Sequence, residues 1–385
     1  MGYEVVLFYR YVQLCDLERL IYDWTQYCSN NGILGRCLVA SEGINGTFAG
    51  FDDAIQRLIQ YIRDYDERFA LIDFKLSAGT GTILPFPQLS IYQTNEIISL
   101  GNSKDYINSF VSYDDSSFGG LVNTGVHLDP IDFHDRIKNI DTEKSILIDV
   151  RNKFETDIGK FQNAIPVDTY YFSETWDSLD KIVDQNKEKE IFMYCTGGIR
   201  CEKASAYLRR KGCNNVYQLA GGIAKYIDTV NSNSSLNSLF GGKNFVFDAR
   251  TKQQVQAQST DTIGQCIECN CLHDDYSIKT NCTVCRYPVL ICDKCQFTHH
   301  EYYCTRHRYL QGVYYSDITR FTAEELQRQV LWLQELLLSN ELVLSKNKRK
   351  TIRKQREKIT NYMKDGTSEE QLPKRIGKGF WNAYD

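Results

Sequence analysis

With 385 residues, 42% of them hydrophobic and 12% aromatic, the chain is long enough for two to four domains with real hydrophobic cores. The net charge of −4 is uneven: from Lys346 to the end there are twelve Lys and Arg against five Asp and Glu, which indicates an anionic partner near the C-terminus. The absence of a membrane-length apolar run and of a charged-then-apolar leader excludes a membrane-spanning class and favours a soluble cytoplasmic protein.

Residues 1–80 are expected to form a small α/β domain. The predicted elements are a strand at 5–11, a helix at 14–29, strands at 35–40 and 46–49, a helix at 51–65 and a strand at 73–76. This β-α-β-β-α-β order predicts a ferredoxin-like, acylphosphatase-like α+β sandwich. The sequence Glu42-Gly-Ile-Asn-Gly46 fits a substrate loop and a plain hairpin turn equally well.

Residues 81–126 are expected to be a connector, with an apolar strand candidate at 89–92. Residues 127–235 then alternate apolar strands with helical stretches, which predicts a parallel sheet with helices on both faces. In such sheets the functional site lies at the carboxyl ends of the strands. Asp149, Arg151 and Cys195 all follow predicted strand ends, so we expect them to converge. His127 is better explained as a structural hydrogen-bond donor than as a catalyst.

The whole chain is organised around the sequence Ile191-Phe-Met-Tyr-Cys-Thr-Gly-Gly-Ile-Arg-Cys-Glu-Lys-Ala-Ser205, which predicts a strand, a glycine-rich loop and a helix over 202–211. Glycines let several backbone N–H groups point at one spot, and a helix start adds positive potential there. The Cys195 thiol is therefore expected to ionise more easily than a free thiol, whose pKa is ~8.5.

Four residues separate Cys195 from Arg200, one fewer than in the loop of cysteine phosphatases. A ring of that size resembles the active loop of rhodaneses, in which the cysteine carries a persulfide sulfur. A buried cysteine at a strand end is the alternative, but it gives Gly-Gly beside an arginine no purpose.

Residues 236–262 are polar and are expected to be a linker with one docked, strand-like piece at 243–250. The segment 263–312 contains four close pairs of possible metal ligands: Cys266 and Cys269, Cys282 and Cys285, Cys292 and Cys295, and Cys304 and His307. Each pair can occupy two corners of a tetrahedron, so eight ligands suit two structural zinc ions. Reduced cysteines in a small core, or an oxidised cluster, are the alternatives. Cys271 is a spare cysteine, and spacing alone leaves the assignment of pairs to ions open.

Residues 313–385 are predicted to be a helical, basic extension, with apolar residues at helical spacing from Leu326 to Leu337. The run 346–358 holds eight basic residues and one acidic residue. A solvated helix face is one explanation, but contact with a phosphate backbone is favoured because nothing acidic balances the run. The candidate RNA-binding residues are Lys346, Lys348, Arg349, Lys350, Arg353, Lys354, Arg356 and Lys358.

Taken together, the sequence from Cys195 to Ser205, Asp149-Val-Arg151, the segment from Glu155 to Gly159, Gly43-Ile-Asn45 and Lys243-Asn-Phe-Val-Phe-Asp248 resemble the rhodanese-domain tRNA uridine-34 hydroxylases of the UPF0176 type. The resemblance runs from about residue 3 to about residue 310. It implies an acylphosphatase-like domain, a rhodanese domain and a cysteine-rich tail, in that order. It also implies that the wobble uridine in the anticodon loop of tRNA is converted to 5-hydroxyuridine with molecular oxygen, and that the essential cysteine is Cys195.

The predicted site therefore has Cys195 and Arg200 as catalytic residues. The loop and its supports are expected to be Thr196, Gly197, Gly198, Ile199, Cys201, Asp149, Arg151 and Glu155. No iron triad and no flavin, haem or nicotinamide motif is evident in the sequence, so the oxygen chemistry depends on the resemblance alone. A rhodanese-type sulfurtransferase carrying a persulfide on Cys195 is the second hypothesis. A non-catalytic zinc-and-rhodanese scaffold is the third, and the intact Cys195 and Arg200 count against it.

Overall fold

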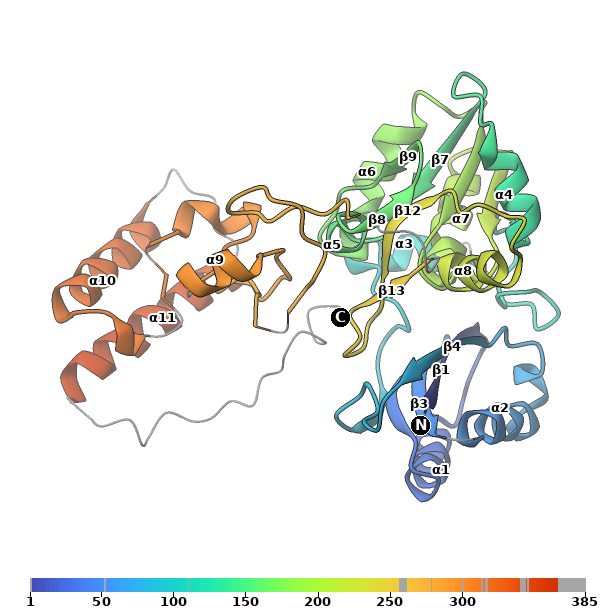
Figure 1. Ribbon diagram of the computed structural model, residues 1–385, viewed down its shortest axis with the longest axis horizontal. Helices are drawn as coiled ribbons and strands as arrows, with labels where there is room; N and C mark the ends of the chain where they lie inside the picture. Colours follow the sequence, from blue (N-terminus) through green and yellow to red (C-terminus); the bar gives the residue numbers. More distant parts are fainter. Residues whose placement is uncertain are drawn as a thin grey trace. The chain divides into compact units, whose positions relative to one another are not determined.

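The structure is a computed structural model that describes residues 2–51, 53–109, 111–255, 262–277, 279–299, 301–312, 314–315, 318–339, 344 and 346–365. The chain divides into two compact units, Met1–Gly264 and Gln265–Tyr384, and both can be followed in Figure 1. No helix among the described residues is both long and apolar enough to cross a membrane.

The first domain is a five-stranded sheet with two helices on one face (Figure 1). Its elements are β1 (Gly2–Tyr11), α1 (Leu17–Asn30), β2 (Leu34–Ala40), β3 (Gly43–Phe51), α2 (Ala54–Tyr65), β4 (Lys75–Thr80) and β5 (Leu89–Gln93). The strand order is β4-β1-β3-β2-β5, antiparallel except for the parallel pair of β2 and β5. An acylphosphatase-like sandwich was expected here, and the alternating strands and helices confirm it.

Strand β1 is buried on both faces, which explains its nearly continuous hydrophobic sequence. Val6 and Phe8 pack with Trp24 of α1 in the core under the helices. Because successive side chains of a strand point to opposite faces, Tyr9 and Tyr11 lie on the other face, where they pack with Ile199 of the second domain.

The structure differs from the sequence-based boundaries in the first domain at three places. The segment 81–126 is more than a connector, because β5 completes the first sheet beside β2. The first helix begins at Leu17, where Asp16 accepts a hydrogen bond from the Arg19 amide, so Leu14 precedes the helix. The second helix begins at Ala54, because Phe51 is still paired with Tyr3 in the sheet.

The second domain contains the predicted parallel sheet, in the order β6-β11-β10-β7-β9. Its strands are β6 (Val126–Leu128), β7 (Ser145–Asp149), β9 (Ala164–Pro166), β10 (Glu190–Tyr194) and β11 (Val216–Leu219). The helices are α3 (Lys104–Asn108), α4 (Pro130–Lys138), α5 (Lys153–Thr156), α6 (Thr175–Val183), α7 (Ile199–Arg210) and α8 (Gly222–Ser232).

Helices cover both faces of this sheet. Ile148 of β7 and Met193 of β10 pack under α6 and α7, with Trp176 and Leu208. The neighbouring residues of the same strands face the other way and pack under α4 and α8 in a second core. The thiol loop lies between β10 and α7, at the carboxyl end of a central strand, as the sequence pattern predicts.

Two strands in the predicted linker extend the second domain. Strand β12 (Phe240–Phe245) pairs antiparallel with β8 (Gly159–Phe161) and with β13 (Lys252–Gln254). The pairing carries the sequence after β12 back toward the first domain, where the Ala249 amide donates a hydrogen bond to the Pro85 carbonyl.

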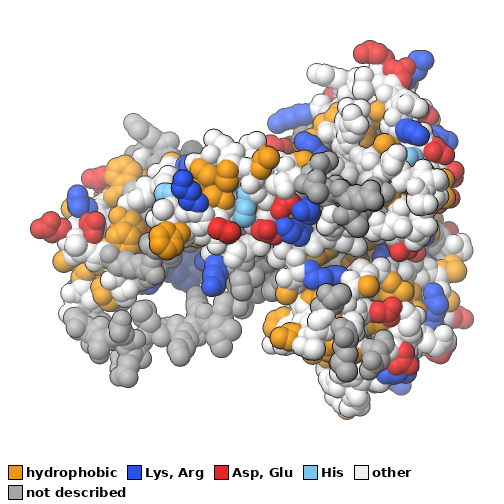
Figure 2. Space-filling view, in the orientation of Figure 1, with side chains coloured by type: hydrophobic (Ala, Val, Ile, Leu, Met, Phe, Trp, Pro, Cys, Tyr) orange, Lys and Arg blue, Asp and Glu red, His pale blue; other side chains and the backbone are white. Residues whose placement is uncertain are grey.

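The C-terminal unit contains the cysteine-rich segment and a helical hairpin. Its helices are α9 (Asp293–Thr298), α10 (Ala323–Leu338) and α11 (Lys346–Asp365). Leu333 of α10 packs with Ile352 and Ile359 of α11 in a core that also includes Tyr303 and Leu310. A capping box at Thr322 and Glu325 starts α10. Hydrophobic side chains also reach the surface of this unit, and Figure 2 shows them in orange.

Candidate functional site

The candidate site is built on the loop from Cys195 to Gly198. Gly198 has φ of 101°, a conformation that glycine adopts at little cost, and its amide donates a hydrogen bond to Cys195 Sγ at 3.1 Å. Helix α7 starts at the next residue, one turn earlier than the sequence suggested, so Arg200 belongs to its first turn. The thiol therefore faces backbone N–H groups at a helix start, where negative charge is stabilised.

Helix α8 holds the loop from behind. The amides of Ile223 and Ala224 donate hydrogen bonds of 3.0 Å to the carbonyls of Cys195 and Thr196. A Cβ on Gly222 would lie 2.6 Å from the Cys195 carbonyl oxygen, so a glycine is required for this close approach. The first turn of α8 thus fixes the backbone of the reactive cysteine.

The pKa of the Cys195 thiol is lowered to about 6. Burial alone would raise the pKa of this thiol, but hydrogen bonds from Cys201, the positive charge of Arg200 and the backbone amides of both residues act more strongly in the opposite direction. The pKa of Cys201 is instead raised well above its usual value by burial and by its hydrogen bond to Cys195. At neutral pH the pair therefore holds its negative charge on Cys195.

A buried ion pair lies directly behind the loop. Arg200 Nη1 and Nη2 lie 2.5 and 2.7 Å from the two carboxylate oxygens of Glu155, and Nη2 also lies 3.2 Å from Thr196 Oγ1. Thr196 Oγ1 donates a hydrogen bond of 2.7 Å to Glu155, and the Asn152 amide donates another. Burial by itself would raise the pKa of Glu155, but Arg200 outweighs it and lowers that pKa. Arg200 was predicted to be catalytic; its hydrogen bonds go to Glu155 and Thr196, and its positive charge lowers the pKa of Cys195.

A second buried pair supports the same end of the sheet. Arg151 donates hydrogen bonds of 2.9 and 2.7 Å to Asp149, the last residue of β7, and one of 2.6 Å to the Gly159 carbonyl. Both residues are fully buried. Asp149 pairs with Tyr194, the residue before Cys195, and Arg151 ties the end of β7 to the start of β8.

The first domain covers the loop, which sequence reasoning did not anticipate. A Cβ on Gly197 would lie 2.9 Å from Leu7 Cδ2, and one on Gly198 would lie 3.1 Å from Tyr9 Oη. Tyr9 Oη donates a hydrogen bond of 2.7 Å to Glu202 of α7. The His127 ring lies 2.9 Å from the same carboxylate. Cys195 is consequently fully buried.

The Glu42-Gly-Ile-Asn-Gly46 sequence also joins the two domains. Glu42 Oε2 accepts a hydrogen bond of 3.0 Å from Lys203, the residue after Glu202 on α7, and Glu42 Oε1 accepts one from the Ile97 amide. Asn45 donates to the Ile97 carbonyl. This segment is a β-turn and strand start whose polar groups brace the helix behind the thiol loop.

A pocket of about 50 Å³ lies beside the loop. Its walls come from the face of the first sheet opposite α1 and α2, from Thr196 and Ala224, and from the segment 244–253 that follows α8. The lining residues are Val5, Leu7, Thr47, Lys75, Leu76, Ser77, Thr196, Ala224, Asn244, Val246, Phe247, Asp248, Arg250 and Gln253. A single water molecule needs a cavity volume of ~10–15 Å³, so the pocket has room for a larger group.

Comparison with known families matches three parts of the chain in the expected order. The UPF0176 acylphosphatase like domain matches residues 3–97, the Rhodanese-like domain matches 132–229, and the Rhodanase C-terminal family matches 241–307. A protein from Staphylococcus haemolyticus named tRNA uridine(34) hydroxylase is 34% identical over 69% of this chain and 76% of its own length. One of the same name from Cytophaga hutchinsonii is 32% identical over 76% of this chain and 86% of its own.

The chain belongs to the tRNA uridine(34) hydroxylase family. The suspected family resemblance is thereby confirmed. An Arabidopsis thaliana relative, Rhodanese-like domain-containing protein 6, is 33% identical over 78% of this chain, but the chain spans only 52% of that protein's length.

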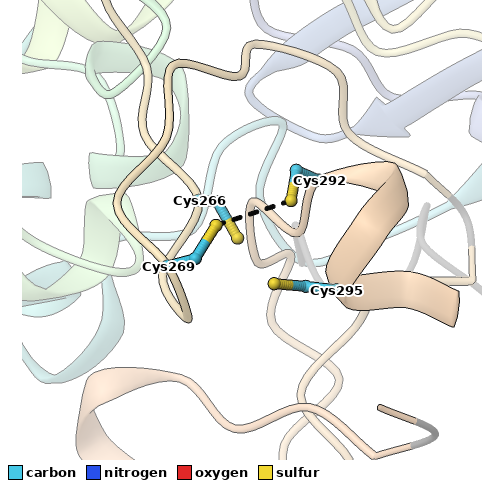
Figure 3. Close-up of side chains that lie close together, drawn as sticks. All are labelled: Cys266, Cys269, Cys292 and Cys295. Atoms are coloured by element: carbon cyan, nitrogen blue, oxygen red, sulfur yellow. Dashed lines mark hydrogen bonds between the residues drawn. The ribbon is translucent and has the colours of Figure 1, made fainter. Parts of the chain in front are cut away.

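The C-terminal part of this hydroxylase-family chain holds two sets of four metal-ligand side chains. Cys266, Cys269, Cys292 and Cys295 form one set, and Cys282, Cys285, Cys304 and His307 form the other. Within each set all four donor atoms lie within 4.8 Å of one another, and Figure 3 shows the sulfur atoms of the first set pointing toward one another. Three or four thiolates at tetrahedral corners fit a structural zinc site.

The two sets interleave along the chain, so the first and third pairs share one site, and the second and fourth pairs share the other. Both sites repeat one local design. The first pair of each site forms a tight turn in which the first cysteine's amide bonds to a carbonyl five residues later and the residue after the second cysteine has positive φ, as at Asn270 and Arg286. The second pair of each site begins a helical turn, with Cys292 and Cys304 at the N-cap. This cross-braced pairing was one of the arrangements that spacing left open.

Helix α11 carries all eight basic residues of the predicted RNA-binding run, and the structure separates them. Lys346, Lys348, Lys350, Arg353 and Lys354 are exposed, whereas Arg349, Arg356 and Lys358 are half-buried. Arg349 donates a hydrogen bond of 3.0 Å to the Leu337 carbonyl near the end of α10, so part of the run stabilises the hairpin.

Proposed function

We propose that this chain hydroxylates the wobble uridine of tRNA at carbon 5 and that Cys195 is the reacting group. The observation that carries the proposal is the buried Cys195, whose pKa is lowered to about 6, in a loop of backbone N–H groups. The relatives named tRNA uridine(34) hydroxylase support the reaction and the substrate. The tRNA anticodon loop is the partner, and the cytoplasm, where tRNA is found, is the proposed location.

The chemistry follows from the uracil ring. Carbon 5 is a poor nucleophile in the intact ring, whereas carbon 6 is electron-deficient. The Cys195 thiolate adds to carbon 6, and the electron pair of the 5,6 double bond moves to carbon 5 and O4 as an enolate. The positive charge of Arg200 and the backbone amides of the loop stabilise the negative charge of the thiolate and of the enolate.

Molecular oxygen is the proposed oxidant, and the electrons balance with a dithiol reductant. The enolate carbon attacks O₂, and the outer oxygen of the resulting peroxide takes up one proton, which gives a hydroperoxide on carbon 5. The dithiol reduces this group to a hydroxyl and water and becomes a disulfide. Loss of the proton on carbon 5 and of the Cys195 thiolate from carbon 6 then restores the double bond. One uridine, one O₂ and one dithiol thus give one 5-hydroxyuridine, one water and one disulfide.

Mass spectrometry of tRNA nucleosides, from cells with and without the protein, tests the reaction. We expect the deletion to remove a mark of ~16 Da on uridine and the wild-type gene to restore it, whereas Cys195→Ser should not. Loss of a sulfur mark instead would show that Cys195 carries a persulfide for transfer and would overturn the hydroxylase proposal.

The addition step has its own test. An anticodon stem-loop with 5-fluorouridine at position 34 should form a covalent adduct with Cys195, because fluorine on carbon 5 hinders the final elimination. Peptide mapping should find the RNA on Cys195 and none on Cys201. If no adduct forms under conditions in which the normal stem-loop turns over, a persulfide or sulfenic acid on Cys195 becomes the better explanation.

We propose zinc as the metal of both cysteine sets. One ion would be held by Cys266, Cys269, Cys292 and Cys295, and the other by Cys282, Cys285, Cys304 and His307. Each site has no room in its ligand set for substrate, so the role of zinc is to stabilise a small domain that has little core of its own.

A further inference from the structure

One residue that lines the pocket beside the thiol loop has a buried polar atom without a partner. Asn244 on β12 is fully buried and lines the pocket, and its Oδ1 has no hydrogen-bond partner. Its Nδ2 lies 3.5 Å from Gln253 Oε1, which leaves Oδ1 as the free acceptor. A buried acceptor that lacks a partner costs ~1–3 kcal/mol, so its presence in a pocket indicates a ligand that donates to it.

The composition of the pocket fits a flat aromatic ring. Val5, Leu7 and Phe247 supply apolar surface, as in most ligand sites. Lys75, which is only 5% exposed, also lines the pocket. Its Nζ donates a hydrogen bond of 2.9 Å to the Asp73 carbonyl and lies 3.3 Å from the Asp73 carboxylate. The same Nζ lies 4.7 Å from the centre of the Tyr9 ring. A ring with carbonyl oxygens, which becomes an enolate during reaction, is the kind of group that such a cation stabilises.

The pocket also lies next to the reactive loop. Thr196 follows Cys195 directly and forms part of the pocket wall, and Leu7 lines the pocket while it covers Gly197. Both domains contribute to it, since Lys75 belongs to β4 and Asn244 to β12. A base splayed out of a single-stranded loop reaches its reacting group in pockets of this kind.

We propose that this pocket receives the base of nucleotide 34 and that Asn244 is the residue that selects uracil, by accepting a hydrogen bond from its N3–H. The inference rests on the proposed function for the identity of the RNA. Uracil presents a donor at N3 between two carbonyl oxygens, whereas cytosine presents an acceptor at N3. The Asn244 amide oxygen therefore stabilises uracil and opposes cytosine, and Lys75 donates to a carbonyl oxygen of the same ring.

Binding of three anticodon stem-loops to the full-length protein tests the assignment. They carry uridine, 3-methyluridine or cytidine at position 34 and are otherwise identical. The wild-type protein should bind the uridine stem-loop about ten- to hundredfold more tightly than either of the others, the range of one good base contact. Equal binding of the uridine and 3-methyluridine stem-loops by the wild type would overturn the assignment without any variant.

Two variants separate base reading from a structural role. Asn244→Ala removes the acceptor and leaves room for the methyl group, so the ratio of the uridine and 3-methyluridine affinities should fall close to one. Asn244→Asp keeps an acceptor in place and should retain the preference for uridine. If Asn244→Ala weakens binding of all three stem-loops equally and leaves the ratio unchanged, Asn244 acts only through the fold.

The same stem-loops distinguish this inference from the proposed reaction. A protein that prefers uridine in binding but adds no oxygen to it would overturn the reaction and keep the pocket. A protein that hydroxylates uridine and 3-methyluridine at the same rate would keep the reaction and overturn the role of Asn244.

Discussion

Cys195 in the loop before α7 and Cys201 in the first turn of α7 share one negative charge, and their pKa values move apart for that reason. A pKa of about 6 for Cys195 means that the thiolate forms as the pH rises through about 6 and predominates at neutral pH. We expect kcat/KM for the stem-loop to rise with pH across this range and then to level off. A profile that rises only near pH ~8.5 would show that the loop does not activate the thiol.

The hydrogen bond from Cys201 can be tested through the same profile. Cys201→Ala removes the donor, so the acid limb of kcat/KM should move to higher pH, while Cys201→Ser restores a donor and should return the limb toward the wild-type position.

Cys195→Ser should abolish turnover with little change in Tm, because it preserves the size of the side chain. If Cys201→Ser is as inactive as Cys195→Ser, Cys201 has a redox role of its own.

Arg200 and Glu155 should depend strongly on each other. Removing the charge in Arg200→Met leaves the Glu155 carboxylate buried and unpaired, which should destabilise the fold by ~3–5 kcal/mol. The double variant Arg200→Met with Glu155→Gln should recover part of this loss. Urea unfolding measures the free energy of unfolding of the single and the double variant. Lys144→Ala, which breaks an exposed pair with Asp141, is the control and should change the free energy of unfolding by less than ~1 kcal/mol.

Sequence alone could identify the residues of the thiol loop, because Cys195, Gly197, Gly198 and Arg200 lie close together in one motif. It could not identify the residues that complete the site. Tyr9 meets Glu202 across 193 positions, and a tyrosine in a hydrophobic strand looks like any core residue. The sequence also could not predict the hydrogen-bond partners of the Arg200 guanidinium, because they depend on where the fold places Glu155.

At the scale of elements, the start of α8 controls the shape of the thiol loop. We expect Gly222→Ala to lower kcat sharply, because its Cβ would lie 2.6 Å from the Cys195 carbonyl oxygen and its φ of 65° is unfavourable for alanine. Gly212→Ala is the matched control: its φ of 95° is also positive, but nothing lies within 4 Å of the added Cβ. Gly212→Ala should therefore lower Tm slightly and leave kcat intact.

Equal losses of kcat in the two glycine variants would mean that backbone strain alone, and not the contact with the loop, causes the effect.

At the scale of elements, too, the sequence was only partly informative. The sequence shows two adjacent glycines, Gly221 and Gly222, but only the packing of α8 against the loop shows why a side chain is excluded at Gly222. In the same way, β5 looked like part of a connector, because its partner β2 lies some fifty positions earlier in the chain.

At the scale of the whole molecule, the cross-braced pairing makes a prediction that spacing could not. Cys269→Ser and Cys292→Ser should each remove the same ion, so the metal content of purified protein should fall from about two zinc ions to about one in either variant and no further in the double variant. Cys269→Ser combined with Cys285→Ser should instead remove both. If the first double variant loses both ions, the pairs are assigned wrongly; a folded, protease-resistant wild-type segment without metal would end the zinc proposal.

The basic hairpin gives the last prediction, and its packing decides how to make the test. Deleting residues 346–385 would remove Ile352 and Ile359 from the core they share with α10, so a deletion would confuse charge with folding. Replacing the exposed Lys350, Arg353 and Lys354 with glutamine keeps that core. If all three contact phosphates, the slope of log K against log salt for tRNA binding should become shallower by about 2–3, because each contact contributes ~0.7–0.9.

The control variant removes three other exposed cations of the same unit, Lys279, Lys294 and Arg328. It changes the net charge by the same amount, so a general effect of charge would flatten the slope equally in both variants. We expect the control to keep the wild-type slope. Neither variant should alter the preference for uridine at position 34, because phosphate contacts set affinity and register and carry no base sequence. An unchanged slope in the α11 variant would assign its basic face to solvent or to a protein partner.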